Sequence, residues 1–155
     1  MHLTQLIFIY NHFTKNWIRT INITNYETLL LAAKQQPTPQ RFLFVFLKKS
    51  LSEDSDSEQV FRFQSGLGGE LQPVMSVDKP LDELTGFNDL VTESKQMQKP
   101  WDIVLVACLS GNSGNMPSAE DSKKPLEIML KTVESGGDLS KYMAFDKEGT
   151  PLQFS

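Results

Sequence analysis

Two aspartates, Asp78 and Asp146, stand where an acid and a base could be arranged. Each follows a predicted strand and precedes a lysine. If both strands ended at one edge of a sheet, the two carboxyl groups could act as an acid–base pair. Aspartate is also a favoured turn residue, because its side chain bonds to the backbone two positions further on. The sequence leaves both interpretations open, and the turn is the simpler one.

A second candidate site is the polar loop of residues 110–121, between an apolar run and an amphipathic helix. In open α/β sheets ligands bind beyond the carboxyl ends of strands, and the N–H groups at a helix N-terminus can hold an anion. The G-x-x-G spacing lacks the lysine of a Walker loop, and Glu120 and Asp121 bring negative charge to the same place. A structural loop is therefore the simpler interpretation. The candidate ligand-binding residues are Ser110, Gly111, Asn112, Ser113, Gly114 and Asn115.

Residue types that often carry catalysis are scarce in this chain. Its two histidines, His2 and His12, lie in the first 20 residues, and Cys108 is the only cysteine. The remainder has no imidazole for a catalytic triad or a metal site, and no intrachain disulfide can form. We therefore expect no metal, no cofactor and no catalytic activity, and a reducing, cytoplasmic location.

Charge and hydropathy restrict the partners. The formal net charge is −4, and an acidic chain without basic clusters is not typical of nucleic-acid binding. No apolar run approaches the roughly 20 residues that span a bilayer. We therefore expect neither a nucleic-acid partner nor a membrane partner. The expected partner is a protein or a small molecule, and no pattern indicates an oligomeric state.

Hydrophobic periodicity predicts one domain over residues 21–155. Residues 41–47 and 102–109 are apolar on both faces, which is typical of interior strands. A strand at 71–77 contains Pro73, which indicates an edge position or a bulge. Strands at 142–145 and 150–154 flank a turn that ends in Gly149. Helices are predicted after Thr24 or Asn25, at 57–64, from 81 or 82 to about 98, and up to Gly136 with Asp121, Ser122 or Ser118 as the cap.

This order of elements predicts an α/β fold with a mixed, mostly parallel sheet of about five strands flanked by helices. A helix joins each consecutive pair among the strands at 71–77, 102–109 and 142–145, so these should be mutually parallel. The last two strands should form an antiparallel C-terminal hairpin. Residues 1–20 differ in composition and are interpreted as a loosely ordered extension, although one apolar helical face there could instead contact a membrane surface.

Short segments of residues 21–155 carry a resemblance to a known family: PQRFLFVF at 39–46, VDK at 77–79, WDIV at 101–104, Gly68-Gly69, Ser110-Gly111 and Phe145-Asp146. With these segments the chain resembles small bacterial proteins labelled ribonucleotide reductase subunit alpha. That reaction uses a redox-active cysteine pair, which a chain with one cysteine does not supply, so no catalytic residue is carried over. We expect a binding or interaction module. The alternative is an enzyme or sensor that binds a small anionic ligand at residues 110–121.

Overall fold

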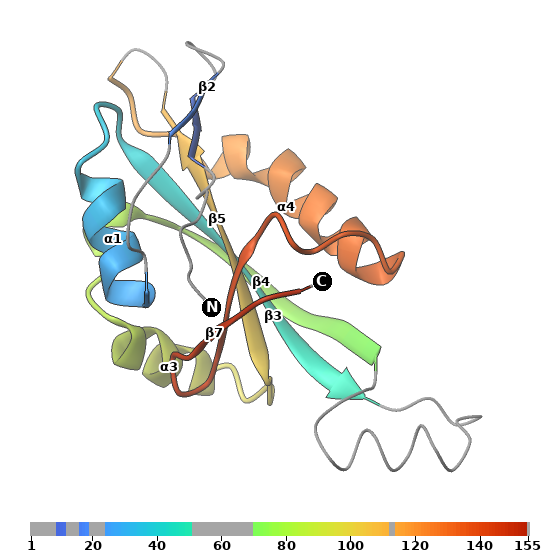
Figure 1. The fold of residues 1–155 in the computed structure, drawn as a ribbon. Coiled ribbons are helices and arrows are strands. Elements are labelled where there is room, and N and C mark those ends of the chain that lie inside the picture. Colours follow the sequence, from blue (N-terminus) through green and yellow to red (C-terminus); the bar gives the residue numbers. More distant parts are fainter. Residues whose placement is uncertain (1–8, 12–15, 19–23, 51–69, 112–113, 155) are drawn as a thin grey trace.

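The computed structural model describes residues 9–11, 16–18, 24–50, 70–111 and 114–154, which form one α/β domain (Figure 1). The strands of its single sheet are β1 (Ile9–Asn11), β2 (Asn16–Ile18), β3 (Gln40–Ser50), β4 (Glu70–Pro80), β5 (Ile103–Ser110), β6 (Met143–Asp146) and β7 (Pro151–Leu152). The helices are α1 (Tyr26–Lys34), α3 (Phe87–Lys95) and α4 (Ala119–Glu134), and a 3-10 turn, η1 (Leu81–Glu83), follows β4.

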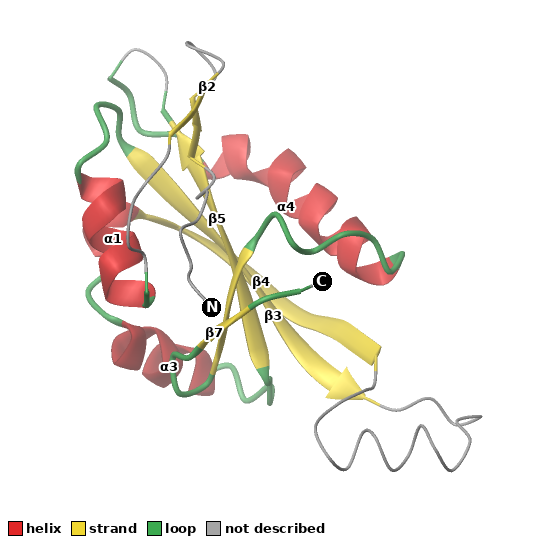
Figure 2. Cartoon of the chain, in the orientation of Figure 1, coloured by secondary structure: helices red, strands yellow, loops and turns green. Residues whose placement is uncertain are grey.

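Helices cover both faces of the sheet (Figure 2). Residues of α1, η1 and α3 pack with one set of strand side chains, and residues of α4 pack with the other set. The pattern of β3 explains the division, because Phe42, Phe44 and Phe46 belong to the first cluster while Leu43, Val45 and Leu47 belong to the second. The prediction that residues 41–47 form an interior strand with two apolar faces is confirmed. We call the first side the aromatic face and the second side the α4 face.

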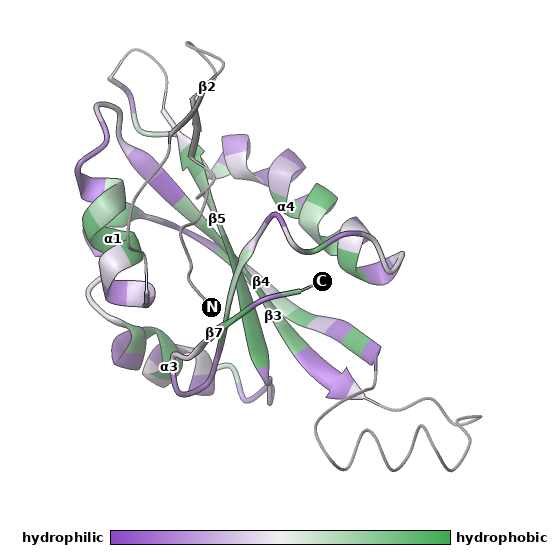
Figure 3. Ribbon diagram, viewed as in Figure 1, coloured by the Kyte–Doolittle hydropathy of each residue, from purple (hydrophilic) through white to green (hydrophobic). Residues whose placement is uncertain are grey.

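The predicted mostly parallel sheet is wrong. Strands β4, β3, β5, β6 and β7 lie in this order, and every neighbouring pair among them is antiparallel. β3 and β5 are nearly continuous in apolar residues and occupy the middle, whereas the more polar β4 takes the edge (Figure 3). β4 and β5 do run in the same direction, but β3 lies between them and antiparallel to both. The local pattern predicted the strands but not which strands lie next to each other in the sheet.

The helix α4 also does not lead to a parallel strand. β6 pairs with β5 in antiparallel orientation, with Met143 opposite Val106 and Asp146 opposite Ile103. The connection formed by residues 135–142 is longer than the roughly 2–6 residues usual between a helix and a strand of a parallel unit. It lets the chain turn back before β6 begins. The predicted C-terminal hairpin is present as β6 and β7, with Gly149 at φ 83° in its turn.

The helix predicted from residue 81 or 82 to about 98 is two separate elements. η1 ends at Glu83, and α3 begins only at Phe87, after Gly86 in extended conformation. Met97, inside the predicted helix, lies beyond the end of α3 and is 58% exposed. Pro73, by contrast, lies on the edge strand as predicted, next to a register shift at Phe46 and Leu47.

The predictions for α1 and α4 agree more closely with the structure. Asn25 caps α1 as predicted, in a capping box with Thr28. α4 is capped by Ser118 in a capping box with Asp121, which confirms the third of the predicted caps, and Pro125 lies inside the helix. The predicted helix at 57–64 lies outside the described residues. No helix in the described part of the chain is long and apolar enough to cross a membrane.

The N-terminal extension contributes two short strands. β1 pairs with β2 in antiparallel orientation, and it pairs with the end of β5 in parallel orientation, with Ile9 opposite Cys108. Tyr10 and Trp17 are partners in the first of these pairings, so they do not share a helical face. The remaining parts of residues 1–20 lie outside the described residues.

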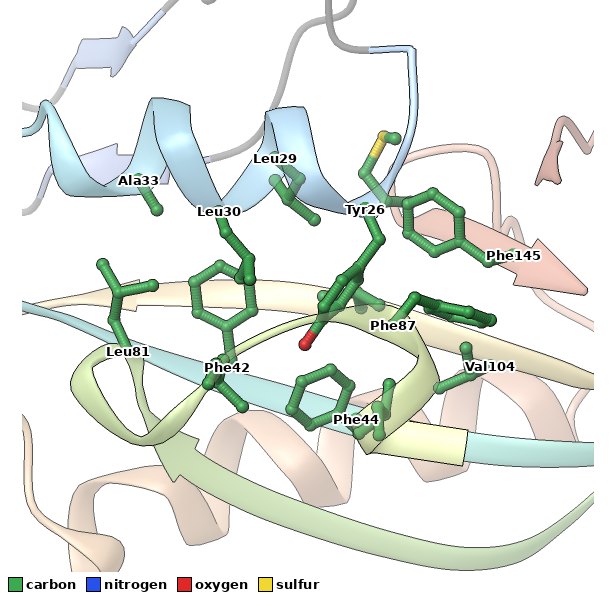
Figure 4. Close-up of a cluster of buried hydrophobic side chains, with 14 of the residues drawn as sticks. Tyr26, Leu29, Leu30, Ala33, Phe42, Phe44, Leu81, Phe87, Val104 and Phe145 are labelled. Carbon is green, nitrogen blue, oxygen red and sulfur yellow. The ribbon is translucent and has the colours of Figure 1, made fainter. Parts of the chain in front are cut away.

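The aromatic face has a tight core in which Tyr26 lies at the centre (Figure 4). The ring of Tyr26 meets Phe87 at 5.4 Å and Phe145 at 5.9 Å between centroids, both in edge-to-face geometry. Such aromatic pairs contribute about 0.5–1.5 kcal/mol beyond their buried area. The helix α1 packs Tyr26, Leu29 and Leu30 against this face of the sheet, together with Phe87 of α3.

Candidate functional site

The start of the predicted ligand loop is tied to the beginning of β3. Ser110 is buried at the end of β5, where its Oγ lies 3.1 Å from Nε2 of the buried Gln40. The backbone N–H of Gly111 donates to the carbonyl oxygen of Pro39 at 2.8 Å. Ser110 and Gly111 therefore use these polar groups to join β5 to β3.

The two glycines of the loop have different local roles. A Cβ at Gly111 would lie 1.9 Å from the carbonyl oxygen of Asn115, so the loop closes back on itself there and only glycine fits. Gly114 has φ 78°, in the left-handed region that favours glycine, with open space around it. Gly114 and Asn115 are exposed, whereas Asn112 and Ser113 lie outside the described residues.

The N-terminus of α4 carries its own negative charge. Oγ of Ser118 accepts from the N–H of Asp121 at 3.1 Å, and Oδ2 of Asp121 accepts from the N–H of Ser118 at 2.9 Å. These bonds hold the pKa of the Asp121 carboxyl below its usual value, so the group is ionised at neutral pH. A carboxylate thus occupies the place that an anionic ligand would take at this helix end.

Arg41, which forms an ion pair with Asp78, also anchors the loop of residues 110–121. Nε and Nη2 of Arg41 each lie 2.7 Å from Oδ2 of Asp78, and Nη1 donates to the carbonyl oxygen of Pro117 at 3.2 Å. Both side chains are largely shielded, at 14% and 24% exposure. The guanidinium therefore fastens the loop to β3 and β4, and Asp78 balances its charge. The guanidinium of Arg41 is therefore not open to a ligand at this loop.

The two candidate catalytic acids do not meet. Asp78 lies in β4 and Asp146 ends β6, with β3 and β5 between them. Three interstrand spacings of about 4.8 Å separate them by roughly 14 Å across the sheet alone. Oδ1 of Asp146 accepts from the N–H groups of Glu148 and Thr150, both at 2.9 Å. Asp146 is therefore a turn residue, and Asp78 is the ion-pair partner of the largely shielded Arg41.

The other reactive groups do not form a centre either. Cys108 packs against the aromatic face, and burial raises the pKa of its thiol well above the usual value, which disfavours the nucleophilic thiolate. Within the described ranges, no group of histidine, cysteine, aspartate or glutamate side chains is placed to hold a metal ion. A depression of about 470 Å³ lies beside the loop, but Met116 is the only described loop residue in its lining.

A groove that the sequence did not predict lies between β4 and the end of α3. Its volume is about 140 Å³, and its apolar lining is Phe46, Met75, Val77, Leu90 and Met97. The register places Met75 opposite Phe46 and Val77 opposite Phe44, so both side chains belong to the aromatic face. Val77 is 37% exposed, which leaves part of this apolar surface in water.

The groove borders an open strand edge. β3 is the only strand of the described part of the chain that pairs with β4, so the outer edge of β4 is unpaired there. The polar rim of the groove contains Lys79 and Glu93, which form a salt bridge with each other. The sequence signals available for this site were Pro73 and the two apolar residues Met75 and Val77, which share one face of the strand. The contribution of α3 depends on tertiary packing, which the sequence pattern does not give.

Comparison with known proteins leaves the geometry as the only guide to function. No family model, no curated protein and no solved structure matches this chain. The resemblance drawn from short sequence segments therefore stays a prediction.

Proposed function

We propose that this chain is a small cytoplasmic binding module without catalytic activity, which adds an extended segment of a partner protein to the edge of its sheet. The unpaired outer edge of β4, beside the apolar groove, is the observation that carries this proposal. An unpaired strand offers a row of N–H and C=O groups to another chain. In strand addition these groups supply affinity, and neighbouring pockets for alternate side chains supply specificity.

The usable part of β4 is residues 74–79. Pro73 has no N–H to donate and stands beside the bulge, and Pro80 ends the strand. Between the two prolines the register with β3 is regular from Met75 onward. The partner segment is therefore a short extended stretch that pairs with about half of β4.

The groove selects uncharged, apolar side chains. Lys79 and Glu93 neutralise each other at the rim, so the groove has no net charge to attract an ionic side chain. Val77 and Met97 would lose their contact with water when a segment docks, and methionine adapts to partners of different shape. Because side chains alternate along a strand, every second residue of the segment should be apolar.

A library of short random peptides selected against the full-length protein tests the proposal. Selected peptides should alternate apolar residues with polar ones and should perturb the backbone amide resonances of residues 74–79. Val77→Lys places a charge at the mouth of the groove and should weaken binding at least tenfold by fluorescence anisotropy. Ile128→Lys is the matched control, because Ile128 is also exposed, at 47%, but lies on α4. The Ile128→Lys variant should bind the selected peptides as tightly as the wild type does.

Two results would overturn the proposal. One is selected peptides that map away from β4 and bind the Val77→Lys variant normally. The other is steady turnover in a broad hydrolase and phosphatase screen that is lost in Asp78→Asn or Asp146→Asn, since the module is expected to have no activity. The second result would restore the two aspartates as catalytic candidates.

A further inference from the structure

A second cavity lies on the other side of the end of α3. Its volume is about 260 Å³, and it opens between α3, the segment of residues 98–101 and the turn that joins β6 to β7. Three lysines line it, Lys95, Lys99 and Lys147, and its other lining residues are Val91, Gln98, Pro100 and Trp101. No carboxylate belongs to this lining, although the chain as a whole has a net charge of −4.

The three lysines have no carboxylate partner among the described residues. The four salt bridges of that part of the chain involve Arg41, Lys79, Lys123 and Lys131. The negative end of the α3 dipole explains a lysine in the last turn of this helix, as Lys95 is. It does not explain Lys147, which reaches the cavity from a separate hairpin.

Trp101 forms a fixed wall of the cavity. Its Nε1 donates to Oγ of Ser94 at 2.8 Å, and its ring meets Phe46 at 5.0 Å between centroids in edge-to-face geometry. Trp101 as a residue is 3% exposed, so its side chain has little freedom to move. Nζ of Lys147 lies 5.8 Å from the ring centroid, within the range of a cation–π contact. One ammonium group is therefore held at the wall without a carboxylate.

The backbone at Gln98 brings the remaining lysine to the cavity. Gln98 has φ 56°, and it is the only residue other than glycine with a positive φ in the described part of the chain. This conformation turns the chain after α3 so that Lys99 lines the same cavity as Lys95. Charges from the helix, the turn after it and a distant hairpin thus converge on one volume.

We propose that this cavity binds a small phosphorylated molecule, with the phosphate group among the three lysines and an apolar body against Val91, Pro100 and Trp101. Lysine ammonium groups bind phosphate as compact point charges, so three of them around one cavity suit a phosphate group. The volume is slightly below the roughly 300–1,000 Å³ of common ligand pockets, so the ligand is small. This site is independent of the peptide site at β4.

Trp101 provides the signal for a direct test. The chain has two tryptophans, so Trp17→Phe leaves Trp101 as the single reporter. Its fluorescence should change saturably with phenyl phosphate and, at higher concentration, with inorganic phosphate, at constant ionic strength. Acetate should have no effect. Calorimetry on the wild-type chain should give the same order of affinity, which checks that the Trp17→Phe change is harmless.

Variants of single lysines test whether phenyl phosphate binds in this cavity. Lys95→Gln, Lys99→Gln and Lys147→Gln should each weaken phenyl phosphate binding at least fivefold, by calorimetry as well as by fluorescence. Lys131→Gln is the control, because Lys131 is exposed on α4 and bonds to Glu127. Unchanged affinity in all three cavity variants, or a signal that rises without saturation, would overturn the proposal. Equal affinity for phenyl phosphate and inorganic phosphate would overturn its apolar part.

Discussion

The two faces of the sheet are built from different kinds of side chain. The aromatic face buries one tyrosine, one tryptophan and five phenylalanines, enclosed by α1, η1 and α3. The α4 face buries leucine, isoleucine, valine, methionine and alanine, and its aromatic residues, Tyr142 and Phe154, are only partly buried. Among the described residues, 17 belong to the buried core of the first face and 9 to that of the second.

This difference indicates where the chain can hold a site. Rotamers locked by packing keep a binding surface in place, and the aromatic face supplies such support. Both cavities that we propose as binding sites use residues of this face, Phe46 and Trp101. The loop of residues 110–121 leads to the α4 face, and its described polar groups serve mainly to connect strands. The following predictions test the contrast between the faces.

The largest effect is expected at β3. Phe44→Ala should cost about 3–5 kcal/mol of unfolding free energy, as is typical of a buried phenylalanine. Val45→Ala, the adjacent residue on the α4 face, removes two methyl groups at about 0.8 kcal/mol each and leaves a small cavity, for a total near 2 kcal/mol. Urea denaturation of both variants measures the difference. A cost below about 1 kcal/mol for Phe44→Ala would mean that this side chain is not packed in the core of the aromatic face.

A substitution at Tyr26 should increase the free energy of unfolding, whereas Phe44→Ala and Val45→Ala decrease it. The hydroxyl oxygen of Tyr26 is buried without a hydrogen-bond partner among the described residues. Tyr26→Phe removes this unsatisfied group, which typically costs about 1–3 kcal/mol, and should stabilise the protein by roughly 1–2 kcal/mol. A thermal melt at neutral pH measures the change. Destabilisation by more than about 1 kcal/mol would indicate a partner for the hydroxyl.

The same residue predicts a dependence on pH. Burial raises the pKa of Tyr26 above its ordinary value of 10.0, with smaller contributions from Cys108 and Glu27. As the pH rises past this ordinary value, the unfolded chain therefore loses the phenolic proton first, and the stability of the fold falls. Burial raises the pKa of Cys108 in the same direction. Tyr26→Phe should reduce the alkaline loss of stability without abolishing it.

The helix ends should be equivalent on the two faces. Asn25 caps α1 and Ser118 caps α4, each in a complete capping box. Asn25→Ala and Ser118→Ala should each cost about 1 kcal/mol. Equilibrium denaturation of the pair compares them directly. A cost at one end that is several times the other would show that the caps, and not only the cores, differ between the faces.

The smallest effect is expected on the outer surfaces of the helices. Leu31 of α1 is 57% exposed and Ile128 of α4 is 47% exposed. Leu31→Lys and Ile128→Lys should each change stability by less than about 0.5 kcal/mol, as surface substitutions usually do. A larger loss in either variant would reveal a contact that covers this residue.

Local pattern was sufficient for some of the fold. The two apolar faces of β3, the cap of α1, the edge position of Pro73 and the turn at Gly149 follow from hydrophobic pattern, capping and backbone preference. These features depend on residues close in sequence. The start of the long helix was misplaced because Gly86, in extended conformation, separates Leu84 from Phe87, so two short elements share one apolar stripe in the sequence.

The sheet order and the candidate sites depend on contacts that no local pattern contains. β3 pairs not only with β4, the next described strand in the sequence, but also with β5. It therefore lies between β4 and β5, which were expected to be parallel neighbours. Asp78 was read as a strand-end acid, yet its role is set by Arg41 in another strand. The groove and the lysine cavity each combine α3 with a strand or a turn from elsewhere in the chain. Such sites emerge only when the elements are assembled.

The central position of β3 has a consequence for how the domain folds. Its pairing with β5 brings Gln40 to Ser110, 70 residues further along the chain. A long loop must therefore close before the middle of the sheet exists, and such non-local pairing makes folding slow. Because β3 is hydrogen-bonded along both edges, its amides should open to solvent only when the whole domain unfolds. β3 is thus both a late contact to form and the last to exchange its hydrogens.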